Sequence, residues 1–187
     1  MTDDDDIRAL RRSLSEAAAF DELFVRHHVA IRRYLHARVA QEDVAEDLAS
    51  ETFARAFAAR ARFGDQGHGV RAWLFQIATN LLRDELRARR RAWERGTSPG
   101  RDSGAPPDLP GDPALTAHLR QLPHGQLEVL LLYAWADLSY EDIAMVLGIR
   151  VGTVRSRLHR ARAELQRGLT ATTEPTRAPA RPEGSAT

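Results

Sequence analysis

The sequence has no cysteine, no lysine and no long hydrophobic run. Without cysteine there can be no disulfide, thiolate nucleophile, iron–sulfur cluster or Cys-based zinc site. Without lysine there can be no Walker-type phosphate loop, although 64–69 is rich in glycine. The longest apolar stretch, 129–136, is far shorter than the ~20 residues that span a bilayer, and the acidic start does not fit a secretory signal. We therefore expect a cytoplasmic protein with no membrane insertion.

The chain has many charged side chains, and its positive and negative charges almost cancel. The 187 residues include 27 basic side chains, all of them arginine, and 26 acidic ones, so the formal net charge is +1. Hydrophobic residues make up 43% of the chain, which is enough for one or two folded domains.

The prolines divide the chain. Five of the nine lie between 99 and 113 and three lie between 175 and 182, in segments without apolar periodicity. We expect an acidic N-terminal extension (1–14), a first domain (15–95), a flexible Pro/Gly-rich linker (96–111), a second domain (112–168) and a disordered tail (169–187).

Apolar residues recur at spacings of three and four, which predicts an all-α fold with two small helical domains. One predicted core stripe of the first domain comprises Phe20, Leu23, Phe24, Ile31 and Leu35. No segment shows the sustained alternation of a strand, and no βαβ unit is visible.

The second domain has the pattern of a helix-turn-helix between 139 and 165. Ser139 and Asp142 have the spacing of a capping box, and Gly148 can adopt the positive φ of the turn between the helices. The following helix carries six arginines and one acid, Glu164. Guanidinium groups suit both phosphates and guanine edges, so we expect this helix to contact DNA in the major groove.

Two further helices of the first domain carry unusual polar faces. The helix from about 42 to 57 has five acids before any base, a pattern that fits either a solubilising face or a docking surface for a basic partner. The helix from about 71 to 91 has a face with Asn80, Arg83, Arg87 and Arg91, which suits base edges and phosphates.

Three motifs in this order resemble the bacterial RNA polymerase sigma factors of the sigma-70 family, extracytoplasmic-function (ECF) group. They are DVAEDLASETF (43–53), AWLFQIATNLLRD (72–84) and GTVRSRLHRAR (152–162). The resemblance implies a sigma factor that binds core RNA polymerase, directs it to minus-10 and minus-35 promoter elements, and assists promoter melting and transcription initiation.

The resemblance also implies a role for individual residues. Core polymerase, through the clamp helices of its largest subunit, would contact the acids Asp43, Glu46, Asp47 and Glu51. The minus-10 element would contact the loop 63–70 and the helix after it, through Phe63, Asp65, Trp73, Asn80, Arg83, Arg87 and Arg90. The minus-35 element would contact the second helix of the helix-turn-helix, through Thr153, Arg155, Ser156, Arg157, His159 and Arg160.

Further partners follow from the same resemblance: the flap region of polymerase, promoter DNA and an anti-sigma factor. The seven histidines do not cluster at metal-ligand spacing, so we expect no metal site and no His-based catalysis. With the resemblance to a sigma factor, we expect no cofactor and no enzyme activity. The alternative is a self-sufficient helix-turn-helix repressor or activator, which would bind a duplex operator without polymerase.

Overall fold

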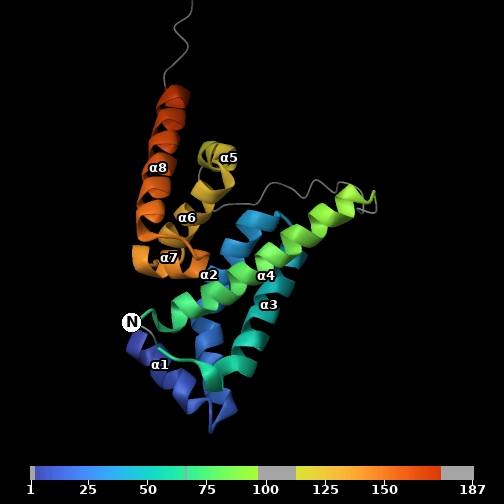
Figure 1. Ribbon diagram of the computed structural model, residues 1–187, viewed down its shortest axis with the longest axis vertical. Helices are drawn as coiled ribbons and strands as arrows, with labels where there is room; N and C mark the ends of the chain where they lie inside the picture. Colours follow the sequence, from blue (N-terminus) through green and yellow to red (C-terminus); the bar gives the residue numbers. More distant parts are fainter. Residues whose placement is uncertain (1–2, 66, 97–112, 174–187) are drawn as a thin grey trace, which may run out of the picture.

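The computed structural model describes residues 3–65, 67–96 and 113–173, and every regular element in these ranges is a helix (Figure 1). The predicted all-α fold is confirmed. The elements, including two 3₁₀ turns, are α1 (Asp3–Arg12), η1 (Ala17–Phe20), α2 (Asp21–Val39), α3 (Glu42–Ala59), η2 (Arg60–Arg62), α4 (Gly69–Glu94), α5 (Pro113–Gln121), α6 (His124–Ala134), α7 (Tyr140–Leu147) and α8 (Val151–Thr173). None of these helices is long and apolar enough to cross a membrane.

The first four α-helices form one packed group, which we call the N-terminal group. The helices α2, α3 and α4 pack against one another around side chains with no solvent exposure, such as Leu23, Ile31 and Phe75. The hydroxyl groups of Tyr34 on α2 and Thr79 on α4 lie 3.1 Å apart inside this core. Apolar burial and this internal hydrogen bond together fix α4 against α2.

The acidic start of the chain, which the sequence predicts to be an extension (1–14) outside the first domain, instead forms the first helix of the N-terminal group. Ala9 and Leu10 are buried, and α1 packs on α2 and α4. The four aspartates of the first turn, residues 3–6, precede apolar positions that face the core. Acids in a first turn are favourable because they complement the positive end of the helix dipole.

One residue of the predicted core stripe is only partly in the core. Phe24 is 40% exposed, whereas the other four predicted members of the stripe are buried. Its ring stacks on His28 at 4.5 Å and meets Phe53 edge-on at 4.9 Å between ring centroids. Phe24 therefore lies at the edge between α2 and α3.

The helices α5–α8 form the C-terminal group, and α7 and α8 are the predicted helix-turn-helix. The Ser139 hydroxyl accepts a hydrogen bond from the Asp142 amide (3.0 Å), and the Asp142 carboxylate accepts one from the Ser139 amide (3.1 Å). This capping box starts α7 as the sequence predicts. Gly148 ends α7 with φ +66°, the left-handed conformation that a glycine adopts without strain.

Helix α8 extends further than expected. It continues to Thr173, so the first five residues of the segment that we predicted as a disordered tail are helical. The remainder of that segment, and the predicted linker from 97 onward, lie outside the described residues.

The two helical groups pack directly on each other. Helix α7 lies against the first half of α4, and one continuous core cluster includes residues of both groups (Figure 1). Ala72 and Phe75 of α4 belong to the same cluster as Leu138 and Ile143.

Candidate functional site

The four acids predicted to bind polymerase lie on one exposed side of α3. Asp43, Glu46, Asp47 and Glu51 are all exposed and recur at spacings of three and four residues. Glu46 lies 3.0 Å from Nε2 of His28, and Glu51 pairs with Arg55 at 2.7 Å. Within the described part of the chain, Asp43 and Asp47 have no basic partner. This side of α3 therefore presents at least two uncompensated carboxylates to a basic surface.

The loop before α4 forms a small cavity with aromatic walls. The rings of Phe63 and Trp73 lie 5.1 Å apart, and Gln76 and Arg62 complete much of the lining of a space of about 270 Å³. Asp65 accepts hydrogen bonds from the amides of Gly67 (2.9 Å) and Gly69 (3.5 Å), which shapes the loop. Two aromatic rings beside polar groups suit a flat, unpaired base.

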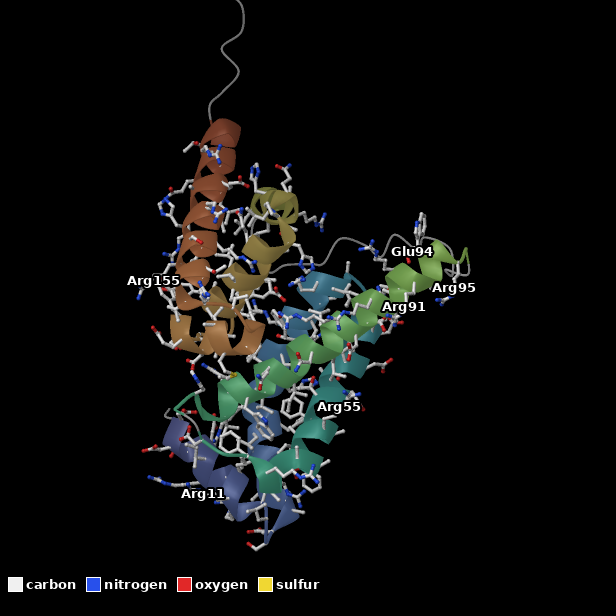
Figure 2. The ribbon with its side chains drawn as sticks, viewed as in Figure 1. Arg11, Arg55, Arg91, Glu94, Arg95 and Arg155 are labelled. Carbon is white, nitrogen blue, oxygen red and sulfur yellow. The ribbon has the colours of Figure 1, made fainter. Side chains whose placement is uncertain are left out.

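The solvent side of α4 carries most of the remaining residues predicted for the minus-10 element. Asn80, Arg87 and Arg90 are exposed. Arg87 pairs with Asp84 (3.2 Å) and Arg90 with Glu94 (2.9 Å), both through surface ion pairs that cost little to break. The far end of α4, with Arg91 and Arg95, projects away from the packed helices (Figure 2).

Arg83 differs from its neighbours because it contacts the C-terminal group. Its Nη2 donates a hydrogen bond to the carbonyl of Leu147 (3.2 Å) and lies 3.8 Å from Glu128. The structure therefore does not leave this predicted DNA-binding side chain free on the surface of α4.

The residues predicted to contact the minus-35 element lie along α8. Arg155, His159 and Arg160 are exposed, and Figure 2 shows Arg155 on the outer side of the helix. Thr153, Ser156 and Arg157 are half-buried. The Ser156 hydroxyl donates to the carbonyl of Thr153 (3.1 Å), and Arg160 donates to the carbonyl of Ser156 (3.2 Å). Exposed guanidinium groups on the second helix of a helix-turn-helix are positioned for phosphates and base edges.

A buried ionic cluster that sequence analysis missed joins α2, α4 and α6. Glu128 of α6 is 8% exposed and lies 3.7 Å from Arg38 of α2, which is 2% exposed. Burial and the charge of Glu128 raise the pKa of the neighbouring Tyr34 to about 12. Burial, followed by the nearby charge of Arg38, lowers the pKa of His124. No periodicity or motif could identify this cluster, because its charged members on the three helices, Arg38, Arg83 and Glu128, are at least 45 residues apart in the sequence.

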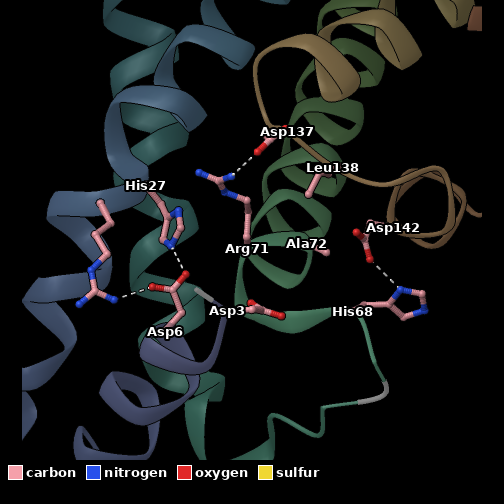
Figure 3. Close-up of a pocket in the computed structure, with 10 residues that line it drawn as sticks. Asp3, Asp6, His27, His68, Arg71, Ala72, Asp137, Leu138 and Asp142 are labelled. Atoms are coloured by element: carbon pink, nitrogen blue, oxygen red, sulfur yellow. Dashed lines mark hydrogen bonds and ion pairs between the residues drawn. The ribbon is translucent and has the colours of Figure 1, made fainter. Parts of the chain in front are cut away.

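A second polar cavity lies between α1, α4 and α7 (Figure 3). Asp3 accepts a hydrogen bond from the amide of Val70 (3.2 Å), and burial raises the pKa of Asp3. Gly69 has φ +65°, a conformation that glycine adopts without strain, and a Cβ at this position would displace the Asp3 carboxylate. His68 lies 2.9 Å from Asp142 across the same cavity. The residues of the described ranges include no cluster of His, Asp and Glu arranged to hold a metal ion.

Comparison with known proteins identifies the class. A family model described as "Sigma-70 region 2" matches residues 23–92, and one described as "Sigma-70, region 4" matches residues 114–165. The chain is 37% identical over 145 residues to the ECF RNA polymerase sigma factor EcfG of Rhodopseudomonas palustris, with 73% of this chain and 77% of that protein covered.

Solved structures agree with this result. CnrH, in complex with the cytosolic domain of CnrY, has a TM-score of 0.66 at 30% identity, covering 89% of this chain and 97% of that chain. The sigma factor RpoE of Bartonella quintana, in complex with the anti-sigma factor NepR, has a TM-score of 0.69 at 29% identity, covering 82% and 98%.

The fold and the two matched regions define a transcription initiation factor, which directs RNA polymerase to promoters. The chain belongs to the sigma-70 family, and its relatives place it among the ECF sigma factors. The family predicted from the three sequence motifs is thereby confirmed.

Proposed function

We propose that this sigma factor contacts core polymerase, the minus-10 element and the minus-35 element through three separate exposed surfaces. The acids of α3, Asp43, Glu46, Asp47 and Glu51, bind the clamp helices of core polymerase. The loop 63–70 and α4 contact the minus-10 element, and α8 contacts the minus-35 element. We assign the N-terminal group to the first two tasks and the C-terminal group, which also meets the flap region, to the third.

The observation that carries this proposal is the separation of charge between helices. The exposed carboxylates of α3 include Asp43 and Asp47, which have no basic partner among the residues that the structure describes, whereas the exposed side of α8 carries Arg155 and Arg160. A chain with a net charge of +1 can therefore present one acidic surface to a basic protein and basic surfaces to DNA at the same time.

Three finer statements belong to the same proposal. The protein acts in the cytoplasm, where polymerase and promoter DNA are found, and it acts by binding rather than by catalysis. The flipped minus-10 base would enter the cavity beside Phe63 and Trp73, which would support promoter melting. An anti-sigma factor would control it, as the complexes of its relatives CnrH and RpoE with CnrY and NepR suggest.

Reconstituted transcription tests the proposal as a whole. We expect promoter-specific run-off transcripts only when the purified chain and core polymerase are both present, and weak promoter binding by the chain alone. Tight binding of the chain alone to a duplex palindrome, together with no affinity for core polymerase, would instead establish the alternative of a self-sufficient regulator.

The polymerase surface has its own test. The double variant Asp43→Asn, Asp47→Asn removes two exposed carboxylates that pair with no basic side chain in the described ranges, so the fold should be unaffected. We expect its affinity for core polymerase to fall by about tenfold, since rim charges at interfaces contribute mainly through long-range attraction. The control Asp4→Asn removes an exposed acid from α1 and should bind like the wild type. Equal affinities for all three chains would remove α3 from the interface.

A further inference from the structure

The end of α4 carries a concentration of positive charge. Residues 87–95 include five arginines and one acid, Glu94. Three of these arginines pair with an acid three or four positions away: Arg87 with Asp84 (3.2 Å), Arg89 with Glu85 (2.6 Å) and Arg90 with Glu94 (2.9 Å). Among the residues that the structure describes, Arg91 and Arg95 pair with no acid. The tip of α4, by which we mean Arg91 and Arg95, therefore presents two uncompensated guanidinium groups.

The tip lies on the side of α4 that we assign to the minus-10 element. Asn80, Arg87, Arg91 and Arg95 follow one another at spacings of seven, four and four positions, so they share one side of the helix. All four side chains are exposed. Figure 2 shows Arg91 and Arg95 at the end of the helix that projects away from the packed helices. The tip thus continues a surface that faces DNA in the proposed function.

The length of α4 sets how far the tip reaches along DNA. Arg95 lies 22 positions after Trp73, a distance of about 33 Å in an α-helix. Successive phosphates of one DNA strand are about 3.4 Å apart along the duplex axis, so this distance spans at most about ten base pairs. A minus-10 element is shorter than that. A helix with its flipped base beside Trp73 therefore brings its tip to DNA outside the element.

The tip faces the part of the promoter that stays double-stranded. The cavity beside Phe63 and Trp73, where the flipped base would enter, lies at the start of α4, and the tip lies at its other end. Melting extends from the minus-10 element toward the transcription start site, so the spacer on the opposite side of the element remains a duplex. Duplex DNA carries one negative charge per about 1.7 Å, and guanidinium groups suit phosphates. Charge and position therefore both favour the spacer as the partner of the tip.

We propose that the tip of α4 binds phosphates of the double-stranded spacer next to the minus-10 element, as a third DNA contact besides those of the minus-10 and minus-35 surfaces. The inference rests on the proposed assignment of α4 to the minus-10 element. Arg95 lies beyond residue 92, where the match to sigma-70 region 2 ends. Phosphate contacts position a protein on DNA but carry no sequence information, so the tip strengthens promoter binding whatever the sequence of the spacer.

Two junction probes test this contact with holoenzyme. Both carry the unpaired non-template minus-10 strand of a promoter identified by run-off transcription, and both lack the minus-35 element, so α8 does not contribute. The long probe adds about 12 base pairs of spacer duplex, which is more than α4 can reach, whereas the short probe ends at the upstream edge of the minus-10 element. We expect the double variant Arg91→Ala, Arg95→Ala to bind the long probe about tenfold more weakly than the wild type and the short probe equally well.

The salt dependence of binding reports how many phosphates are contacted. Loss of one phosphate contact reduces the slope of log affinity against log salt concentration by about 1. We expect the double variant to reduce this slope by about 2 on the long probe and to leave it unchanged on the short probe. Arginine near a helix C-terminus also stabilises the helix, but a less stable helix would weaken binding to both probes rather than to the long one alone.

Arg89→Ala is the matched control. It removes the same kind of side chain two positions from Arg91 but on another side of α4, where Arg89 pairs with Glu85. We expect Arg89→Ala to bind the long probe like the wild type, whereas each of the single variants Arg91→Ala and Arg95→Ala binds it about threefold more weakly. A different spacer sequence of the same length should leave these ratios unchanged.

Three results would overturn the inference. If the double variant binds the long probe like the wild type, the tip does not contact DNA. If it weakens both probes equally, the tip contacts the minus-10 element itself. If it lowers the affinity for core polymerase in the absence of DNA, the tip contacts polymerase instead.

A cavity variant keeps the inference and the proposed function distinguishable. Trp73→Ala removes one wall of the cavity at the start of α4, so it should weaken binding to both probes. If it does so while the tip variants have no effect, the minus-10 assignment stands and the spacer contact is wrong. If Trp73→Ala leaves both probes bound as tightly as by the wild type, the minus-10 assignment itself is wrong, and the inference with it.

Discussion

Nε2 of His27 lies 2.7 Å from Oδ2 of Asp6, and the other oxygen of this carboxylate accepts a hydrogen bond from Arg26 at 2.6 Å. The two contacts tie α1 to α2. Burial alone would raise the pKa of Asp6, but the hydrogen bonds from His27 and Arg26 outweigh it and hold this pKa below 3.8. The carboxylate is therefore charged in the folded protein and contributes to its stability.

Replacement of this carboxylate should destabilise the N-terminal group. We expect Asp6→Asn to lower the free energy of unfolding by roughly 1–3 kcal/mol at neutral pH, because it weakens hydrogen bonds to a charged group. The contribution of Asp6 is complete above the unfolded pKa of 3.8 and is lost as the pH falls through the lower folded pKa. Urea denaturation from pH 7 to pH 2 should thus show the variant and wild type converging in acid. Asp4→Asn is the control, and an equal loss for both variants would contradict the role of Asp6.

Tyr34 should make the protein sensitive to alkali. Its pKa is raised from 10.0 to about 12, so the unfolded chain loses the phenolic proton more readily than the folded one. Stability from this group is complete below pH 10 and disappears as the pH rises from 10 to 12. We expect Tyr34→Phe to cost about 1 kcal/mol at pH 7, through the lost contact with Thr79, and to show a smaller decline above pH 10. Tyr133→Phe, at a partly exposed ring, should keep the wild-type alkaline profile. An alkaline decline in Tyr34→Phe as steep as in the wild type would show that another group is responsible.

The capping box should stabilise the helix-turn-helix measurably. Ser139→Ala removes the acceptor of the Asp142 amide, and we expect a loss of about 1 kcal/mol in urea denaturation. Ser50→Ala, at an exposed position inside α3, should be neutral or slightly stabilising, since alanine is the better helix former. Indistinguishable midpoints for the two variants would mean that the cap contributes nothing.

Arg155 should decide minus-35 recognition. If its guanidinium forms a bidentate contact with a base, Arg155→Ala should lose about 1–3 kcal/mol of discrimination against a mutated minus-35 element. Gel-shift or run-off competition with holoenzyme measures this difference. Gln166→Ala, another exposed residue of α8, should leave discrimination intact. An Arg155→Ala holoenzyme with wild-type selectivity would place this side chain on a phosphate or away from DNA.

Asn80 should affect the other promoter element. Its exposed amide can both donate to and accept from a base edge, so Asn80→Ala should relax the choice of minus-10 sequence while minus-35 selectivity is kept. Run-off transcription from promoters that differ at single minus-10 positions measures the effect. A uniform loss at every position would instead indicate a general role in binding.

Features that depend on neighbours in sequence could be predicted. The capping box and the turn at Gly148 involve residues within a few positions of each other, so their spacing alone defines the geometry. The acids of α3 could be placed on one side for the same reason. Phe24 shows the limit of periodicity: its position on α2 is correct for a core stripe, but it falls at the edge of the contact with α3.

Features that join distant segments could not be predicted. Four consecutive aspartates are typical of a solvated surface, and only the fold shows that Asp3 and Asp6 contact Val70 and His27. The hydrogen bond from Arg83 to the carbonyl of Leu147 likewise depends on how two separately predicted groups of helices pack. A sequence pattern identifies which face of a helix is polar but not which partner that face meets.

The contact between Asp3 and Val70 has a consequence for synthesis on the ribosome. The two residues are 67 positions apart, so α1 is made first yet cannot complete its packing until the start of α4 has emerged. The C-terminal group has shorter loops to close, because α6, α7 and α8 follow one another closely along the chain. Contacts between distant residues form more slowly than local ones. The helix-turn-helix should therefore fold soon after it is made, whereas α1 stays unpacked until the start of α4 has been made.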